Sequence, residues 1–207
     1  MTKLYRLDAV AGEIADAFGA RAGNDPWAGG HVAPMGFAPV ITAGREAIAG
    51  PRKGRGERRM TPRVWGVPPP PKVPYDGRNG VTSVSNPDSP FWIGNLRNSE
   101  FRCLVPATGF MEWGGIGTDG KRRQHWFAPS DQRPFAFCGV WKDSEVPSFA
   151  ILTCPANALL REAGRETMPA ILPPDPAAHH LWLHGDWKRA SALVAPYSSS
   201  LMRDVVR

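Results

Sequence analysis

Six cationic side chains crowd the stretch from Pro51 to Arg63, which contains a single acidic residue, Glu57. They are Arg52, Lys53, Arg55, Arg58, Arg59 and Arg63, and residues 51–63 are called the basic segment below. Lysine and arginine bind a phosphate backbone because they release condensed counterions from it. Trp65 follows directly, and an aromatic ring beside cations suits stacking on nucleobases. The pattern predicts nucleic-acid contact by the basic segment and Trp65, with a merely solvated basic loop as the alternative.

Other reactive side chains form no recognisable catalytic or metal-binding pattern. Cys103, Cys138 and Cys154 lie far apart among apolar residues and lack a CxxC pair, which predicts buried thiols and no zinc or redox site. The sequence has no Ser-His-Asp, Cys-His or HExxH pattern. We therefore expect neither a metal nor a cofactor, and a protease acting on other proteins is the least supported class.

Short strands separated by turn residues are the elements expected to position these side chains. Apolar or alternating runs predict a first strand at residues 4–7 and a strand at 37–42 that turns toward 47–48. Later strands are predicted at 102–106, 109–113, 125–128, 135–141 and 148–153. Helical spacing predicts a helix that Asp8 caps and Gly19 ends, with shorter helices at 157–164, 175–183 and 187–194.

Composition agrees with a single soluble domain over residues 1–207, since 42% of the residues are hydrophobic and 21% are charged. The 22 glycines and 22 prolines favour many turns over long helices. A net charge of +6 favours an anionic partner. The start of the chain lacks the apolar stretch of a secretion signal, and no apolar run reaches about eighteen residues, so we expect a cytoplasmic, nucleoid-associated protein.

Short motifs spread over the chain resemble one known family. They are Leu4–Arg6, Val32–Pro34, Trp65–Gly66, Ser89–Trp92, Arg102–Pro106, Gly109–Trp113, Phe135–Trp141, Pro155–Ala158, Met168–Leu172 and Pro196–Tyr197. Their joint order and spacing resemble the SRAP family, which includes bacterial SOS-response-associated proteins and the vertebrate abasic-site shield protein. The resemblance implies an α+β fold, with a distorted antiparallel β-barrel or sheet, flanking short helices and a basic groove for single-stranded or junction DNA.

The resemblance also implies a particular chemistry. In the family, removal of the initiator methionine frees a cysteine whose amine and thiol attack the aldehyde of an abasic site and form a stable thiazolidine. The same terminus is linked to self-processing and hence to the peptidase name. The accessory residues are an asparagine followed two positions later by an arginine, a glutamate in a stretch resembling F-x-E-W, and a histidine shortly before M-P.

Four of these five positions differ in this chain. Thr2 replaces the cysteine, while Ser83 and Ser85 replace the asparagine and the arginine. The histidine position falls at Gly164 or Arg165, and His31, His125, His179, His180 and His184 belong to other segments. Arginine stays charged and cannot shuttle protons at neutral pH, although Arg165 is able to hold a phosphate or orient a carboxylate.

Glu112 keeps the family glutamate, and in a strand it shares a face with Phe110. It is either a proton-transfer group or a structural carboxylate paired with a nearby arginine. If Met1 is removed, the Thr2 amine remains able to form a Schiff base with an aldehyde. The hydroxyl is a far poorer partner than a thiol for closing a stable ring.

Two functions follow from this comparison. In the first, the protein is a monomer that binds single-stranded or abasic-site DNA in the SOS response, with covalent cross-linking lost or weakened. In the alternative, it is an abasic-site-reactive enzyme that forms a Schiff base through the Thr2 amine and has lyase or autopeptidase activity. The sequence leaves open whether the protein is an enzyme.

Overall fold

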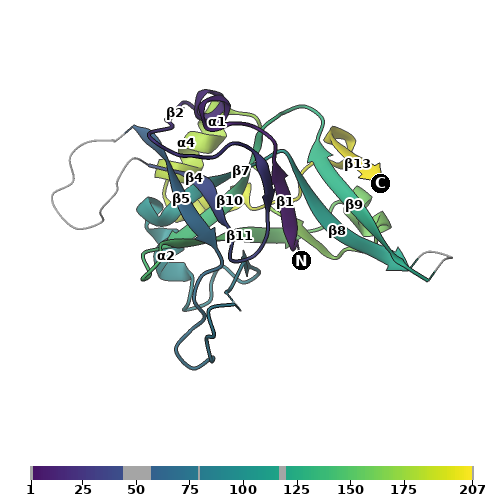
Figure 1. Ribbon diagram of the computed structural model, residues 1–207, viewed down its shortest axis with the longest axis horizontal. Helices are drawn as coiled ribbons and strands as arrows, with labels where there is room; N and C mark the ends of the chain where they lie inside the picture. The colour runs from purple at the N-terminus through teal and green to yellow at the C-terminus, as the bar shows by residue number, and fades with distance from the viewer. Residues whose placement is uncertain (1, 44–56, 79, 117–119, 207) are drawn as a thin grey trace.

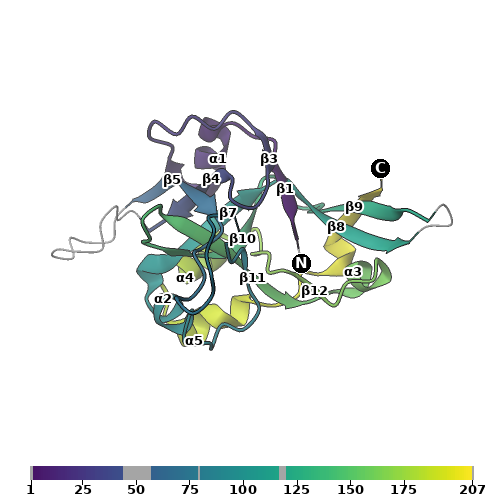
Figure 2. The ribbon, with the colours of Figure 1, turned by 60° about the horizontal axis from the view of Figure 1, so that its bottom comes forward.

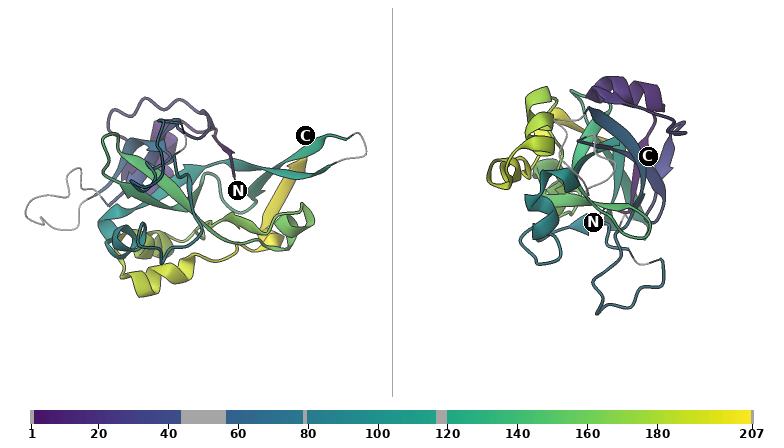
Figure 3. Two further views of the ribbon diagram at one scale, coloured as in Figure 1. Left: turned by 90° about the horizontal axis from the view of Figure 1, so that it is seen from below. Right: turned by 90° about the vertical axis from the view of Figure 1, so that its left-hand side faces the viewer.

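The computed structural model describes residues 2–43, 57–78, 80–116 and 120–206, and it is a mixed α+β structure made mostly of strands (Figure 1). Five antiparallel strands form the first sheet. Their order is β13 (Met202–Val206), β9 (Arg122–Pro129), β8 (Gly109–Ile116), β1 (Leu4–Leu7) and β3 (Gly30–Val32). Strands β8, β9 and β13 extend together away from the rest of the molecule (Figure 3, left).

The second sheet is larger and curls back on itself. Its order is β12 (Thr167–Pro169), β11 (Ser148–Pro155), β10 (Phe135–Lys142), β7 (Arg102–Ala107), β4 (Phe37–Thr42), β5 (Arg58–Trp65) and β2 (Ala20–Arg21), and β6 (Ser83–Val84) pairs with β11. Strand β11 also pairs with β5, through Ser148 with Val64 and Phe149 with Trp65. This extra pairing bends the sheet toward closure without making a clean barrel.

Short helices flank the sheets. They are α1 (Ala11–Phe18), α2 (Ile93–Arg97), α3 (Ala158–Glu162), α4 (Pro176–His184) and α5 (Trp187–Ala190), with single 3₁₀ turns at Ser99–Phe101, Ser191–Leu193 and Ser199–Leu201. Helix α4 is fixed against β7 by Trp182, whose Nε1 donates to the Cys103 carbonyl at 2.9 Å. None of the helices in the described part of the chain is long and apolar enough to cross a membrane.

Aromatic rings join the two sheets in one core. Tyr5 of β1 lies 5.1 Å from the Trp65 ring and 6.0 Å from the Phe137 ring, and Phe110 of β8 lies 5.7 Å from Phe137. Phe110 is fully buried, and Glu112 points to the same face two residues further along β8. The alternation of β8 therefore carries Glu112 to the edge of the core.

The predicted α+β class and most of the predicted elements are confirmed. The prediction of buried thiols is also confirmed, because Cys103, Cys138 and Cys154 are all buried and free. The basic segment differs from prediction, since Arg58 to Arg63 belong to strand β5 instead of a mobile loop. The predicted turn toward 47–48, together with Arg52, Lys53 and Arg55, lies outside the described residues.

Candidate functional site

Strand β1 brings the start of the chain onto Glu112. The β1–β8 register places Leu4 beside Met111 and Tyr5 beside Phe110. Thr2 lies just before β1 in the chain, and its hydroxyl donates a hydrogen bond to Oε1 of Glu112. Both side chains are buried, with Thr2 6% and Glu112 2% exposed. Figure 2 shows the N-terminal end of β1 entering the space between β8 on one side and β12 with α3 on the other.

Arg165 reaches the same carboxylate from the turn between α3 and β12. Gly164 has a φ of 78°, a left-handed conformation that glycine adopts without steric cost. The Arg165 backbone N–H then donates to the Leu160 carbonyl at 2.9 Å, which fixes the turn. Arg165 Nε lies 3.1 Å from Glu112 Oε2 as an ion pair, although this N–H is not aligned for a hydrogen bond. Both oxygens of the Glu112 carboxylate are therefore engaged.

A second polar pair lies next to this carboxylate. His125 stands directly opposite Glu112 in the β8–β9 register, so the two side chains share a face of the sheet. Its Nδ1 lies 2.6 Å from Oδ2 of Asp204 in β13, and its ring stacks on Phe127 at 5.9 Å. Gly114 makes room for the ring, because a Cβ at that position would overlap His125.

Sequence reasoning missed this histidine. His125 lies outside the segment before Met168 that corresponds to the family histidine, and the predicted strand at 125–128 begins at this residue, whereas β9 starts at Arg122 and pairs with β8. A hairpin register drawn from Glu112 would have found it. Nothing in the sequence around Asp204 indicates that it lies near His125, because it reaches this position only through the pairing of β13 with β9.

The other predicted site residues belong to other elements of the fold. Ser83 is half-buried on β6, which pairs with β11 of the second sheet, and Ser85 is exposed just after it. Arg58 and Arg59 open β5, with Arg58 Nη1 donating to the Phe18 carbonyl at 2.7 Å. Trp65 is 1% exposed and its Nε1 donates to the Thr82 carbonyl, so its ring belongs to the core and offers no face to a base.

An exposed aromatic ring, Trp113, is found on the face of the first sheet that points away from Glu112, and it is 37% exposed. The same face carries Trp126, which is only 7% exposed. The Arg6 guanidinium lies 4.6 Å from the centre of the Trp126 ring, and His31 meets that ring edge-on at 5.5 Å. A cation and an exposed aromatic ring on one face are the kinds of group that hold single strands of nucleic acid.

Metal chemistry finds no support in the described residues, where no three His, Cys, Asp or Glu side chains form a cluster that could hold an ion. The thiols are equally unsuited to reaction. Burial raises the pKa of Cys103 to about 12 and that of Cys154 to about 11.

Similarity to known sequences defines the class of protein. The sequence profile of the SOS response associated peptidase (SRAP) family matches residues 4–206, nearly the whole chain. The chain belongs to the SRAP family. This membership supports a DNA-damage-associated function.

Solved structures support the same fold. A protein from Bordetella bronchiseptica has a TM-score of 0.74 and 19% identity, and the match covers 99% of each chain. A protein from Bacteroides thetaiotaomicron has a TM-score of 0.74 and 18% identity over 98% of this chain and 90% of that one. A phage-related protein from Bordetella bronchiseptica has a TM-score of 0.68 and 15% identity over 99% and 93%. No curated protein sequence matched the chain.

Proposed function

We propose that this protein binds single-stranded DNA, including DNA with an abasic site, without capturing the abasic site durably. One observation carries the proposal. The residue at the reactive family position, Thr2, gives its hydroxyl to Glu112, and Arg165 pairs with the other oxygen of that carboxylate. The groups that would attack and transfer protons are thus replaced by a closed polar cluster.

Each replacement removes a chemical capacity. A threonine hydroxyl lacks the nucleophilicity of a thiol and closes no stable thiazolidine with an aldehyde. Arginine does not give up and recover a proton in proteins as a histidine does, so Arg165 does not replace the family histidine in proton transfer. It remains a fixed positive charge, 26% exposed, beside the buried carboxylate.

DNA contact is assigned to the basic segment, apart from Arg63, which is 5% exposed, and to the surface of Arg6 and Trp113. Cations neutralise phosphates regardless of sequence, and aromatic faces accept any base. Trp113 follows Glu112 directly in β8, with its side chain on the opposite face of the sheet. These contacts give binding that depends strongly on salt and weakly on base sequence.

One observation favours a second candidate, a reversible imine on the Thr2 amine. Thr2 is 6% exposed and its hydroxyl is bonded to Glu112, which holds the start of the chain at this carboxylate. If Met1 is removed, the amine lies in that site, with His125 and Asp204 on the same sheet face as a proton-transfer pair. An imine of this kind permits strand cleavage by β-elimination instead of protection.

The two candidates separate in one experiment on abasic single-stranded DNA. Purified protein is incubated with the DNA with and without borohydride, and the products are run on native and denaturing gels. The proposal expects retention on the native gel and no heat-stable adduct in either condition. An adduct that requires borohydride supports the imine, and intact mass establishes whether Met1 has been removed.

A matched pair of variants tests the binding surface. Trp113→Ala is expected to weaken binding of undamaged single-stranded DNA about fivefold or more, because base stacking contributes about 1–3 kcal/mol. Tyr75→Ala removes another exposed aromatic ring, 45% exposed, from a different segment and serves as the control. Equal affinities for both variants would remove this surface from the proposal.

A further inference from the structure

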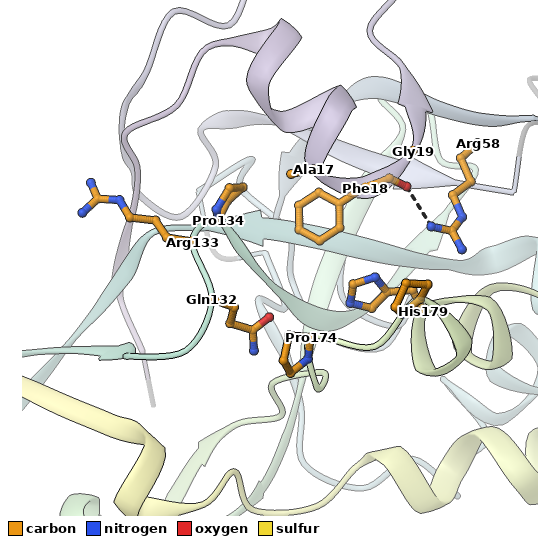
Figure 4. Close-up of a pocket in the computed structure, with 10 residues that line it drawn as sticks. Ala17, Phe18, Gly19, Arg58, Gln132, Arg133, Pro134, Pro174 and His179 are labelled. Carbon is orange, nitrogen blue, oxygen red and sulfur yellow. Dashed lines mark hydrogen bonds between the residues drawn. The ribbon is translucent and has the colours of Figure 1, made fainter.

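A separate cavity of about 370 Å³ lies between the C-terminal end of α1, the start of β5 and α4 (Figure 4). Its apolar wall includes the Phe18 ring with Pro134 and Pro174. Its polar groups come from Arg58 and His179; in Figure 4 Arg58 lies to the right of Phe18 and His179 lies below it. Neither group contacts the cluster of Thr2, Glu112 and Arg165, so the cavity is separate from that cluster, although Arg58 also belongs to the basic segment.

Arg58 brings a positive charge that is only partly compensated. Its Nη1 donates to the Phe18 carbonyl at 2.7 Å, and this is its only hydrogen bond to the described residues. A guanidinium has five N–H donors, so most of its donor capacity remains. Burial lowers the pKa of Arg58, which reflects the cost of holding this charge away from water.

His179 brings a bare acceptor. It is 7% exposed, its ring lies 5.4 Å from the Phe18 ring, and its Nε2 has no hydrogen-bond partner in the described structure. Burial lowers the pKa of His179, and the nearby Arg58 lowers it further, while a hydrogen bond to the Pro173 backbone opposes both. That backbone bond takes Nδ1–H, so the neutral ring presents Nε2 as an acceptor.

We propose that this cavity binds a phosphate monoester, with Arg58 holding its charged oxygens and His179 Nε2 sharing its remaining proton. The charge of Arg58 and the acceptor nitrogen of His179 together favour a phosphate monoester over other ligands. A carboxylate at neutral pH has no proton to offer Nε2, and an uncharged amide leaves Arg58 uncompensated. A phosphate monoester has a second pKa near 6, so it carries both a negative charge and an available proton.

The cavity also suits the organic part of such a ligand. Its volume falls in the range of small-molecule sites, which is about 300–1,000 Å³. The Phe18 ring and the two prolines supply apolar walls for a sugar or base. The phosphate comes either from a free nucleotide or from the 5′ end of a DNA strand.

Charges around His179 determine how binding depends on pH. Arg58 faces it from β5, Asp175 from the start of α4, and Arg133 lies at the rim, while the Asp175 carboxylate accepts from the Ala177 N–H. Arg133 also pairs with Asp8 at 3.9 Å, so Arg58 is the main cation that attracts an anion. One proton is shared between phosphate and imidazole, so affinity rises as pH falls from 8 to 6.

Calorimetry with the whole protein tests the site, using 2′-deoxycytidine 5′-monophosphate, deoxycytidine and inorganic phosphate at pH 6 and pH 8. The monophosphate is expected to bind at least tenfold more tightly than the nucleoside, and more tightly at pH 6 than at pH 8. No binding of the monophosphate or of inorganic phosphate at millimolar concentration would overturn the proposal, as would equal binding of the nucleoside.

Two variants and a control locate the binding. Arg58→Gln removes the cation, and Ala17→Leu adds bulk to the cavity wall from the last turn of α1 while leaving both polar groups in the sequence. Each is expected to weaken monophosphate binding at least tenfold. Arg21→Gln removes a charge from the neighbouring strand β2, where Arg21 pairs with Glu57 outside the cavity, and is expected to have little effect. Equal losses in all three variants would refute the site.

The source of the phosphate is distinguished with oligonucleotides that differ only at the 5′ end. A 5′-phosphorylated strand that binds more tightly than its 5′-hydroxyl counterpart, with the advantage lost in Ala17→Leu, supports a DNA end as the ligand. Binding of the mononucleotide with no such advantage supports a free nucleotide.

Discussion

Replacing Arg165 measures how much its ion pair with Glu112 contributes to the stability of the fold. In Arg165→Ala the Glu112 carboxylate, 2% exposed, loses its positive partner and keeps the hydrogen bond from Thr2. A buried charge without its partner is costly because neither water nor an opposite charge compensates it. Water does enter partly here, since the Arg165 side chain is itself 26% exposed.

The expected loss of stability follows from the exposed fractions of the Glu112 and Arg165 side chains. Breaking a fully buried pair costs about 3–5 kcal/mol, and the partial exposure of Arg165 reduces this to about 2–3 kcal/mol. For a chain of this size each kcal/mol lowers the melting temperature by about 2–4 °C, so a fall of about 5–10 °C is expected. Glu112→Gln keeps the volume and leaves an arginine that can turn to water, so it costs about 1 kcal/mol.

Urea denaturation of the two single variants and the double variant measures the coupling. The double variant is expected to be about 1–2 kcal/mol more stable than the sum of the single losses predicts. Arg161→Ala, an exposed arginine on α3, is the matched control and is expected to be nearly neutral. An Arg165→Ala loss no larger than that of the control, or strict additivity in the double variant, would refute the reasoning.

Four further outcomes are expected. Gly114→Ala forces the His125 ring out of place, so it costs about 1–3 kcal/mol and shifts the His125 ring signals in NMR spectra. Burial raises the pKa of the thiols of Cys103, Cys138 and Cys154. These three thiols are expected to stay unreactive toward a thiol reagent at pH 8 until urea unfolds the chain. The pKa of His179 is lowered in the folded state, so near pH 6 the unfolded chain binds a proton at this residue that the folded chain does not. The free energy of unfolding therefore falls as the pH drops below about 6.5. His179→Gln should reduce this dependence on pH in denaturation series from pH 7 to 5. Neutralising Arg52, Arg55 and Arg59 together should flatten the dependence of DNA affinity on salt, and an unchanged slope would exclude the basic segment.

The resemblance to the family pointed to the residues at the centre of the cluster. It gave Glu112 as the family glutamate and Gly164 or Arg165 as the histidine position before Met168 and Pro169. The contact of Arg165 with Glu112 matches the interpretation of a carboxylate paired with a nearby arginine. Motif order along the chain gives such positions without knowledge of the rest of the fold, but it does not show that they meet.

Long-range pairing explains what the sequence did not predict. His125 and Asp204 are 79 positions apart and meet only because β13 lies beside β9. Trp65 follows a basic segment, but the pairing of β5 with β4 and β11 buries its ring, and no local property distinguishes a buried tryptophan from a stacking one. Arg58 likewise turns toward the end of α1, which folds against β5 from far away in the sequence.

The absence of durable capture is the central claim, and a denaturing gel tests it most directly. The natural protein and a Thr2→Cys/Arg165→His variant are incubated with abasic single-stranded DNA without reductant, heated and compared. The natural protein is expected to give no heat-stable adduct, while the variant, which regains the thiol and a titratable side chain beside Glu112, is expected to form one. A heat-stable adduct with the natural protein would contradict the account.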